Sequence, residues 1–545
     1  MDKRNMAKSA ILFCLLLPPA FAENDIISVN NQATTRIEYD TMQINNSIRI
    51  DNSQYLKGHQ LGLNMDISKT FWNRLYTRVA SNAMSGNLSY GKFTELSSAS
   101  NVWQQINVRM GYSFYPNDKI AFTPYTTTGY QYWQLDTGGK RFRGFNRNGD
   151  TRFYQNGFFG LGLLSQWSPA AKWVASGDIM LGKTYNPWMR YNAPEVPSPI
   201  IGPNIVYQQA MLASQPYYQI GVGIDYRLTK KIHANAGMQY NHYEYSSART
   251  KPSQLVLPHV SISNWNYQVG VGYSLDNDSD NTLNPDNPVL PADLIIHANN
   301  QAALWYGYTM QNYAETVPGI GHYFDRQQGN IPVISISFSK TFSRLYSQLS
   351  LSQGVGNTSY KGELLDGTPS NASTRNTLLD IALRIGYMFF PNDKSCLTPY
   401  IIGGYHRWLR DIAGVPYGGY LVSGYPETYQ HAWYGAGLLA QLTPAPNIVI
   451  NMDGNFGTTK QGQNASWNSF NSPKTYQQTF SLKQRFFFNI GLGGDYRFAR
   501  HWHALAQYNY LHFKYGLSAS SRLGIYEPNS KTHQASIMIG IGYDL

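Results

Sequence analysis

The chain is poor in cysteine and in charge, and it lacks an apolar run long enough for a transmembrane helix. Two of its 545 residues are cysteines, 14% are charged, and its main apolar stretch, Ala10 to Leu17, lies near the N-terminus. A spanning helix needs about 20 consecutive apolar residues, so a helical membrane protein is excluded. Cys14 falls inside the apolar stretch, and a processed chain that keeps only Cys396 has no internal disulfide.

Residues 1–22 have the layout of a secretory signal peptide. Lys3, Arg4 and Lys8 precede the apolar stretch, and Ala20 and Ala22 are the small residues of a cleavage site, so we expect cleavage after Ala22. The formal net charge is +11 for the whole chain, and the remaining basic residues are scattered among polar segments. This distribution favours an anionic lipopolysaccharide surface as the partner, and not nucleic acid.

The rest of the chain is an internal duplication, which has to be recognised before secondary structure is assigned. The matching segments are "NNQATTRIEYDTMQ" (30–43) with "NNQAALWYGYTMQ" (299–311), "SKTFWNRLY" (68–76) with "SKTFSRLY" (339–346), "GYSFYPNDKIAFTPY" (111–125) with "GYMFFPNDKSCLTPY" (386–400), and "IGVGIDYRL" (220–228) with "IGLGGDYRF" (490–498). Copy one covers residues 23–275 and copy two residues 292–545. Between them, residues 276–291 are rich in Asp, Asn and Pro, which predicts a periplasmic linker.

Each copy is predicted to be all-β, because apolar residues alternate with polar or small ones. In "YYQIGVGIDYRL" (217–228), Ile220, Val222 and Ile224 share one face, while Gln219 and Asp225 share the other. The same alternation holds at residues 61–68, 106–114 and 379–389. A soluble sandwich would bury the apolar faces, whereas a transmembrane barrel would turn them to lipid.

Three features favour a transmembrane antiparallel β-barrel. The polar faces carry Gly, Asn and charge, aromatic residues gather at strand ends, and the strands have the length that a tilted membrane strand requires. Short connections such as "YPNDKIAF" alternate with long loops at residues 137–150 and 190–215. This alternation predicts about ten strands per copy, with the short turns in the periplasm. We expect two tandem barrels; one barrel of about twenty strands is the alternative.

Both copies end in a similar octapeptide, "QVGVGYSL" (268–275) and "MIGIGYDL" (538–545). The pattern resembles the terminal assembly signal of Gram-negative outer-membrane β-barrel and porin-like proteins. It is carried by Gln268, Gly270, Tyr273 and Leu275 in copy one and by Gly540, Tyr543 and Leu545 in copy two, where Met538 replaces the polar residue. The family usually ends in Phe. The resemblance implies a multi-pass outer-membrane location and the barrel-assembly machinery as a partner.

The alternation also places charges inside each barrel. These lumen charges are Arg36, Glu38, Asp66, Arg109, Asp225 and Arg227 in copy one, and Asp380, Arg384, Asp453, Asp495 and Arg497 in copy two. Charges of mixed sign in a narrow lumen should pair, because an unpaired buried charge costs several kcal/mol. They form either a network that closes a small barrel or a constriction that filters solutes.

No catalytic, cofactor or metal site is expected. The Gly-x-Gly runs lie within strands and not before a helix, so they do not indicate nucleotide binding. His242 and His512 occupy matching positions near the outer strand ends, where proteases of the omptin family carry Asp and His. No second matched Asp or His cluster accompanies them, and general acid-base catalysis needs such partners. His and Cys spacing indicates no metal site either.

The long loops share a "YQQ" motif at residues 207–209 and 476–478, which predicts either a segment folded into the lumen or an extra strand at the rim. Two functions remain open. One is a porin-like channel for passive passage of small polar solutes. The other is a non-catalytic surface protein, an adhesin or envelope-structural component, that binds through its extracellular loops.

Overall fold

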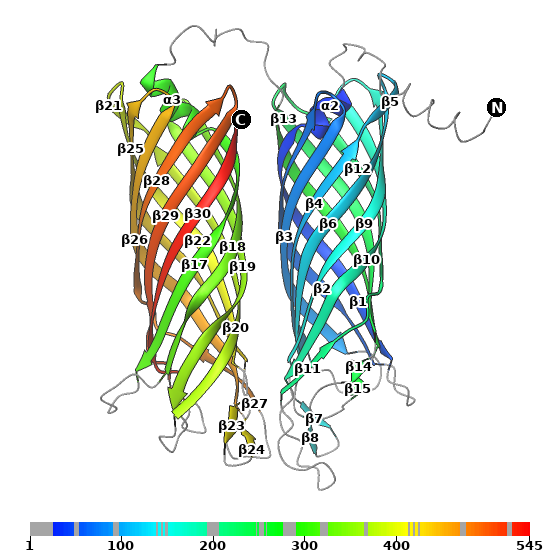
Figure 1. The fold of residues 1–545 in the computed structure, drawn as a ribbon, viewed down its shortest axis with the longest axis vertical. Coiled ribbons are helices and arrows are strands. Elements are labelled where there is room, and N and C mark those ends of the chain that lie inside the picture. The colour runs from blue at the N-terminus through cyan, green and yellow to red at the C-terminus, as the bar shows by residue number, and fades with distance from the viewer. Residues whose placement is uncertain are drawn as a thin grey trace, which may run out of the picture.

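The computed structural model describes residues 25–545 and shows two β-barrels that stand side by side (Figure 1). The residues it does not describe are 1–24, 48–53, 91–97, 138–139, 143–144, 148–150, 193–206, 247, 250–255, 258, 276–289, 317–324, 364–368, 413–414, 418–419, 423–425, 469–475 and 520–525. The signal peptide and most of the linker lie outside the described residues, and their boundaries stay predictions.

Copy one is a closed antiparallel barrel of ten strands, as predicted. Its strands are β1 (Gln32–Ser47), β2 (Gln54–Phe71), β3 (Leu75–Tyr90), β4 (Ser98–Tyr112), β6 (Ile120–Thr137), β9 (Thr151–Ala170), β10 (Trp173–Asn192), β12 (Pro216–Arg227), β13 (Ile232–Tyr245) and β16 (His259–Ser274). The barrel closes where β1 pairs with β16, from Gln32 opposite Ser274 to Ser47 opposite His259.

Copy two closes in the same way, with Gln301 of its first strand opposite Asp544 of its last. Its ten strands are β17 (Gln301–Thr316), β18 (Asp325–Phe342), β19 (Leu345–Glu363), β20 (Pro369–Tyr387), β22 (Ser395–Ile412), β25 (Pro426–Ala445), β26 (Ile448–Asn468), β28 (Phe486–Ala499), β29 (Trp502–Tyr515) and β30 (Asn529–Asp544). Because first and last strands pair within each copy, the prediction of two barrels is confirmed, and the alternative of one large barrel is wrong.

The outer surface of each barrel is an apolar belt. Val222 is 57% exposed on β12, and Ile539 is 64% exposed on β30. Other exposed apolar side chains of the belt are Ile37, Leu61, Leu161, Leu181 and Val269 in barrel one, and Ile401, Ile490, Leu492, Ile537 and Ile541 in barrel two. Outward apolar and inward polar side chains, at a period of two, are the pattern of a transmembrane barrel.

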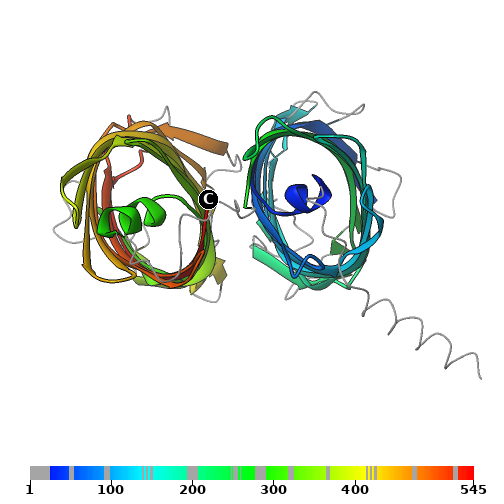
Figure 2. The same cartoon turned by 90° about the horizontal axis from the view of Figure 1, so that it is seen from above.

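One end of both barrels has short turns and a helix, and the other has long loops. The helices α2 (Asp25–Asn30) and α3 (Pro291–Ala298) sit in the mouths of barrels one and two at the short-turn end, as the view from above shows (Figure 2). Short strands β5 (Phe114–Asn117) and β21 (Phe389–Asn392) extend this end. Among the described residues, no helix is long and apolar enough to cross a membrane.

Rim strands extend the opposite, long-loop end. The strand β11 (Tyr207–Met211) pairs with β10, and β27 (Tyr476–Ser481) pairs with β26, so the "YQQ" segments form extra strands and do not fold into the lumen. Small hairpins project further: β7 (Lys140–Phe142) with β8 (Phe145–Arg147), β14 (Ala248–Arg249) with β15 (Val256–Leu257), and β23 (Val415–Tyr417) with β24 (Tyr420–Val422).

The two barrels contact each other through equivalent surfaces. Met65 of β2 and Ile336 of β18 occupy matching positions in the two copies, and both are fully buried in one shared cluster. At the short-turn end the contacts are reciprocal: Lys69 lies 4.8 Å from the ring centre of Tyr543, and Lys340 lies 4.5 Å from that of Tyr273. A surface that meets its own copy in this way is an isologous interface with pseudo-two-fold symmetry.

Near the long-loop end the interface is charged. Arg190 of β10 forms a 2.5 Å ion pair with Asp411 of β22, and both side chains are at most 3% exposed. Arg407 donates to Gln134 at 3.0 Å across the same boundary. These four side chains point out of their barrels, where lipid would otherwise surround them, so the docking of the barrels is what shields them.

Candidate functional site

The lumen of barrel one is crossed by ion pairs between neighbouring strands. Asp66 accepts from Arg36 and, at 3.2 Å, from Arg78. Glu38, fully buried, accepts at 3.0 Å from Gln268, the polar residue of the first closing octapeptide. The alternating strand faces bring these side chains together because β1 lies between β2 and β16.

The other lumen charges of barrel one are paired as well. Arg109 lies 2.7 Å from Asp178, which also accepts from Tyr125 at 2.5 Å. Asp225 contacts His233 at 2.6 Å, and Arg227 reaches Asp25 of α2 at 2.6 Å. The last pair ties the helix to the barrel wall.

Aromatic side chains fill the outer half of this lumen. Trp133 stacks on Tyr154 with ring centres 4.5 Å apart, and Tyr217 stacks on Tyr243 at the same distance. The whole cluster is buried; it also contains Met42, Ile44, Leu56, Met84, Leu88, Trp103, Leu135, Phe158, Met180, Met189, Tyr245, Val260 and Ile262. Packed apolar and aromatic side chains therefore occupy this part of the barrel-one lumen.

Barrel two repeats the aspartate–histidine pair of barrel one at its short-turn end. His503 bridges Asp495 at 2.5 Å and Asp544 at 2.8 Å. Arg497 lies 3.9 Å from Asp544 and donates to the backbone carbonyl of Arg500. The α3 helix packs here through Leu294 and Ile295, in a buried cluster with Met388, Cys396, Tyr400, Ile402, Leu439 and Val449.

The middle of barrel two contains open space. A cavity of about 230 Å³ and a second of about 220 Å³ share Ser350, Ser352, Arg384, Asn509 and Met538 in their walls. The second cavity begins at Ala298, at the end of α3, and the first ends at Phe487 and Phe513. Together they form a central chamber, which we define by these shared residues.

Four of the predicted lumen charges line the central chamber: Asp380, Arg384, Asp453 and Asp495. Arg384 forms a 2.6 Å ion pair with Asp453, which also accepts from Tyr400. Asp380 lies 2.6 Å from His406. Serine, asparagine and these charged groups line the half of the chamber next to α3, while Trp433, Leu378 and other apolar side chains supply much of the lining of the other half.

An outer barrier closes the chamber toward the long loops, and the sequence did not predict it. A buried cluster that includes Trp408, Tyr429 and Phe513 packs across the lumen, and a charged group around Arg410 lies against it. Arg410 is fully buried and lies 2.9 Å from Glu315, 2.8 Å from Asp325 and 3.0 Å from Glu427. Its guanidinium also lies 4.4 Å from the ring centre of Tyr313.

The missed signal lies in the repeat itself. Arg410 stands where copy one has Leu135, and Glu427 where it has Arg152, so the charges of the two lumens differ at this height. When a charged residue replaces an apolar one between otherwise matching strands, the change indicates that the lumens of the two copies differ in function at that position.

The remaining predicted residues lie as follows. Gly270 and Gly540 allow close strand approach, since a Cβ on either would lie within 2.8 Å of a backbone oxygen. The carbonyl oxygen of Leu275 accepts from Lys69 at 3.0 Å, and that of Leu545 from Lys340 at 2.7 Å. His242 and His512 are on the outer surface of their barrels and not in the lumen. Among the described residues, no group of three or more His, Cys, Asp or Glu could hold a metal ion.

Comparison with known proteins gives the fold class only. No protein-family model matches the chain, and no curated protein matches it. The outer membrane protease OmpT from Escherichia coli is 9% identical, covers 45% of this chain and 97% of its own, and has a TM-score of 0.32. The outer membrane transporter YddB from Escherichia coli is 10% identical, covers 94% and 81%, and has a TM-score of 0.28. Likenesses of this strength assign neither an activity nor a ligand to this chain.

Proposed function

We propose that the protein is a non-catalytic outer-membrane channel in which barrel two is a gated passage for small polar solutes. The observation that carries this proposal is the central chamber, which runs from α3 to the outer barrier and has a polar lining next to α3 and a more apolar one toward the long loops. The signal peptide, the apolar belts and the closing octapeptides support the location in the outer membrane, where the barrel-assembly machinery would insert the chain.

The barriers at the two ends differ in chemistry, which supports a gate and not a permanent seal. The inner barrier is a short helix held by apolar contacts, whereas the outer barrier combines a buried aromatic cluster with one cation among three carboxylates. Loss of Arg410 would leave Glu315, Asp325 and Glu427 to repel one another. The outer end of the chamber should then open.

Planar-bilayer conductance tests the passage. We expect wild-type protein to open rarely, and Arg410→Ala to give frequent, cation-selective openings because the carboxylates remain. Leu135→Ala, at the matching position of barrel one, is the control and should stay silent within its packed aromatic cluster. If Arg410→Ala folds and conducts no more than wild type, barrel two is not a passage.

A second function is favoured by the packed outer half of barrel one. The outer half of this lumen is filled with buried apolar and aromatic side chains, so we propose that this barrel serves as a rigid scaffold. Its rim strand and hairpins at the long-loop end would then present a binding surface. Absence of conductance from every variant, together with binding of whole cells to host or envelope components, would favour this surface-protein function.

A further inference from the structure

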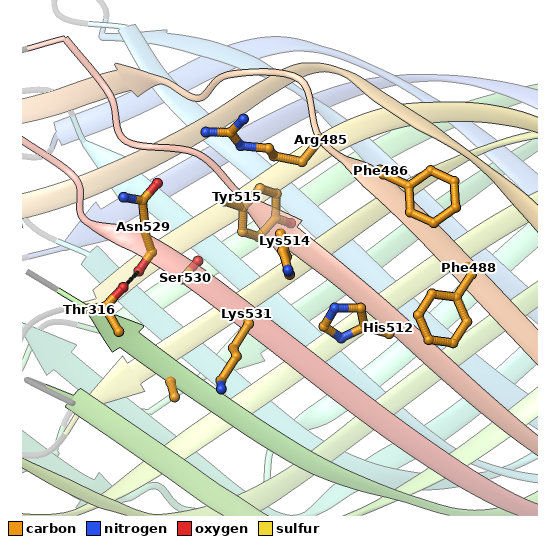
Figure 3. A pocket seen from close by; sticks show the side chains of 11 residues that line it. Thr316, Arg485, Phe486, Phe488, His512, Lys514, Tyr515, Asn529, Ser530 and Lys531 are labelled. Carbon is orange, nitrogen blue, oxygen red and sulfur yellow. Dashed lines mark hydrogen bonds between the residues drawn. The ribbon is translucent and has the colours of Figure 1, made fainter. Parts of the chain in front are cut away.

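The outer face of barrel two carries a basic cluster at its long-loop end. It consists of Arg485, His512, Lys514, Lys531 and His533, and most of it lines a surface pocket of about 630 Å³ (Figure 3). The side chains lie on β29 and β30, with Arg485 just before β28. The eleven residues that line the pocket include no Asp or Glu.

The strand register sets like groups directly against each other. Lys514 is opposite Lys531, and His512 is opposite His533, with their Nδ1 atoms 3.2 Å apart. Like charges in directly opposed positions repel each other. An anion between the two strands would lie within reach of both lysines and accept charge-assisted hydrogen bonds from them.

The position of the cluster relative to the apolar belt indicates which kind of anion it would bind. Below it on β30, Ile537, Ile539 and Ile541 are more than half exposed and belong to the apolar belt. Beside it, Phe486 and Phe488 of β28 line the same pocket, as Figure 3 shows. A cationic site directly above lipid-facing side chains, bordered by aromatic rings, lies at the level of lipid headgroups.

Copy one shows that the cluster is a feature of copy two alone. At the matching positions, Glu244 stands in place of Lys514, and Ser261 and Ser263 stand in place of Lys531 and His533. Glu244 there contacts His242 at 3.2 Å and His259 at 3.6 Å. At the same position of the barrel, copy one therefore has a carboxylate next to its histidines, whereas copy two has lysines next to its histidines.

We propose that the basic cluster binds the phosphate groups of lipid A, the anionic lipid of the outer leaflet, with the acyl chains along the apolar belt below. This site is separate from the proposed passage and does not depend on it. The lysines and Arg485 contact the phosphate oxygens, and the imidazoles donate hydrogen bonds to the same phosphate from the side nearer the apolar belt. The phenylalanines border the sugar and the first acyl carbons.

Binding to the folded full-length chain in detergent tests this site. The probes are bisphosphorylated lipid A, the same lipid A with both phosphates removed, and inorganic phosphate, with bound molecules counted by native mass spectrometry and affinity measured by titration. We expect one tightly bound bisphosphorylated lipid A. Lys514→Glu should weaken that binding about tenfold or more, the loss of at least one charge-assisted contact.

Matched variants keep the test decisive. Lys183→Glu makes the same charge change at an exposed position on β10 of barrel one, away from the cluster, and should leave the affinity unchanged. Lys531→Ser introduces the copy-one residue and should act like Lys514→Glu if the latter fails to fold. In copy one, the double change Glu244→Lys and Ser261→Lys should create a second binding event per chain.

Three outcomes would overturn the proposal. Equal affinity in wild type, Lys514→Glu and Lys531→Ser would show that the cluster does not contact the lipid. Equal binding of phosphate-free lipid A would mean that acyl chains alone are recognised. Competition by inorganic phosphate at the same concentration would indicate a site for free phosphate and not for a lipid.

Discussion

At the scale of single residues, side-chain direction is the property that the sequence predicted best. A strand places successive side chains on opposite faces, so parity alone directed Arg109 and Arg384 inward, and both meet an aspartate there. Parity also directs Asp411 outward, whereas Arg190 faces outward because a β-bulge between Tyr185 and Trp188 shifts the register of β10. That these two outward charges meet each other depends on how the barrels dock, which no local pattern contains.

Val222 tests the direction of the strand faces. It lies within the apolar belt, and an arginine at the lipid-facing midplane of a barrel costs roughly 2–4 kcal/mol. We expect Val222→Arg to lower the amount of folded protein in the outer membrane, measured by heat-dependent gel mobility. The conservative change Val222→Leu at the same position should behave as wild type. Normal levels of folded Val222→Arg would mean that this face does not meet lipid.

At the scale of elements, the strands and their closure were predictable, but the contents of the lumens were not. Alternation and turn length gave ten strands per copy, because both are local properties of the chain. The outer barrier around Arg410 joins side chains from β17, β18, β22 and β25, and the central chamber depends on α3 in the mouth of the barrel. Such contacts arise only when distant strands close into a ring.

The accessibility of Cys396, the sole cysteine among the described residues, can be used to test whether α3 stays packed in the mouth of barrel two. Cys396 is fully buried in the cluster that holds Ile295 of this helix. Ile295→Asp should loosen the helix, because an aspartate in an apolar contact loses its hydration. We expect wild-type protein to resist a small thiol reagent and Ile295→Asp to be labelled rapidly, as measured by mass spectrometry.

Two controls frame the labelling experiment. Urea-unfolded wild type should be labelled fully, and Cys396→Ser should not be labelled in either state. Protection of Cys396 that is equal in wild type and Ile295→Asp would show that α3 is not what shields this end of the lumen.

At the scale of the whole molecule, each copy has what it needs to close alone. In copy one, β1 pairs with β16 over its full length, and no strand of barrel two is required. We therefore expect a chain that stops after Leu275 to insert into the outer membrane and to show heat-dependent mobility. If the shortened chain fails to fold while the full chain folds, barrel one needs its neighbour.

The interface predicts that the barrels stay together without a covalent link. With a protease site placed within residues 276–289, cleavage should leave the halves associated in mild detergent, so that a tag on one half retains the other. Asp411→Ala leaves Arg190 buried without this carboxylate, a loss of about 3–5 kcal/mol for a buried pair, and should release the halves. Asp393→Ala, at an exposed turn, is the control.

The pseudo-two-fold interface also indicates how the molecule arose. Surfaces that meet through equivalent residues, such as Met65 with Ile336, are what a homodimer of single barrels would use. Fusion of two such genes makes the partner permanently available at the millimolar effective concentration of a short tether. The one-to-one ratio of the two barrels is then fixed at translation. Each half can also change its sequence independently, and the presence of Arg410 in one lumen and Leu135 at the matching position of the other is an example.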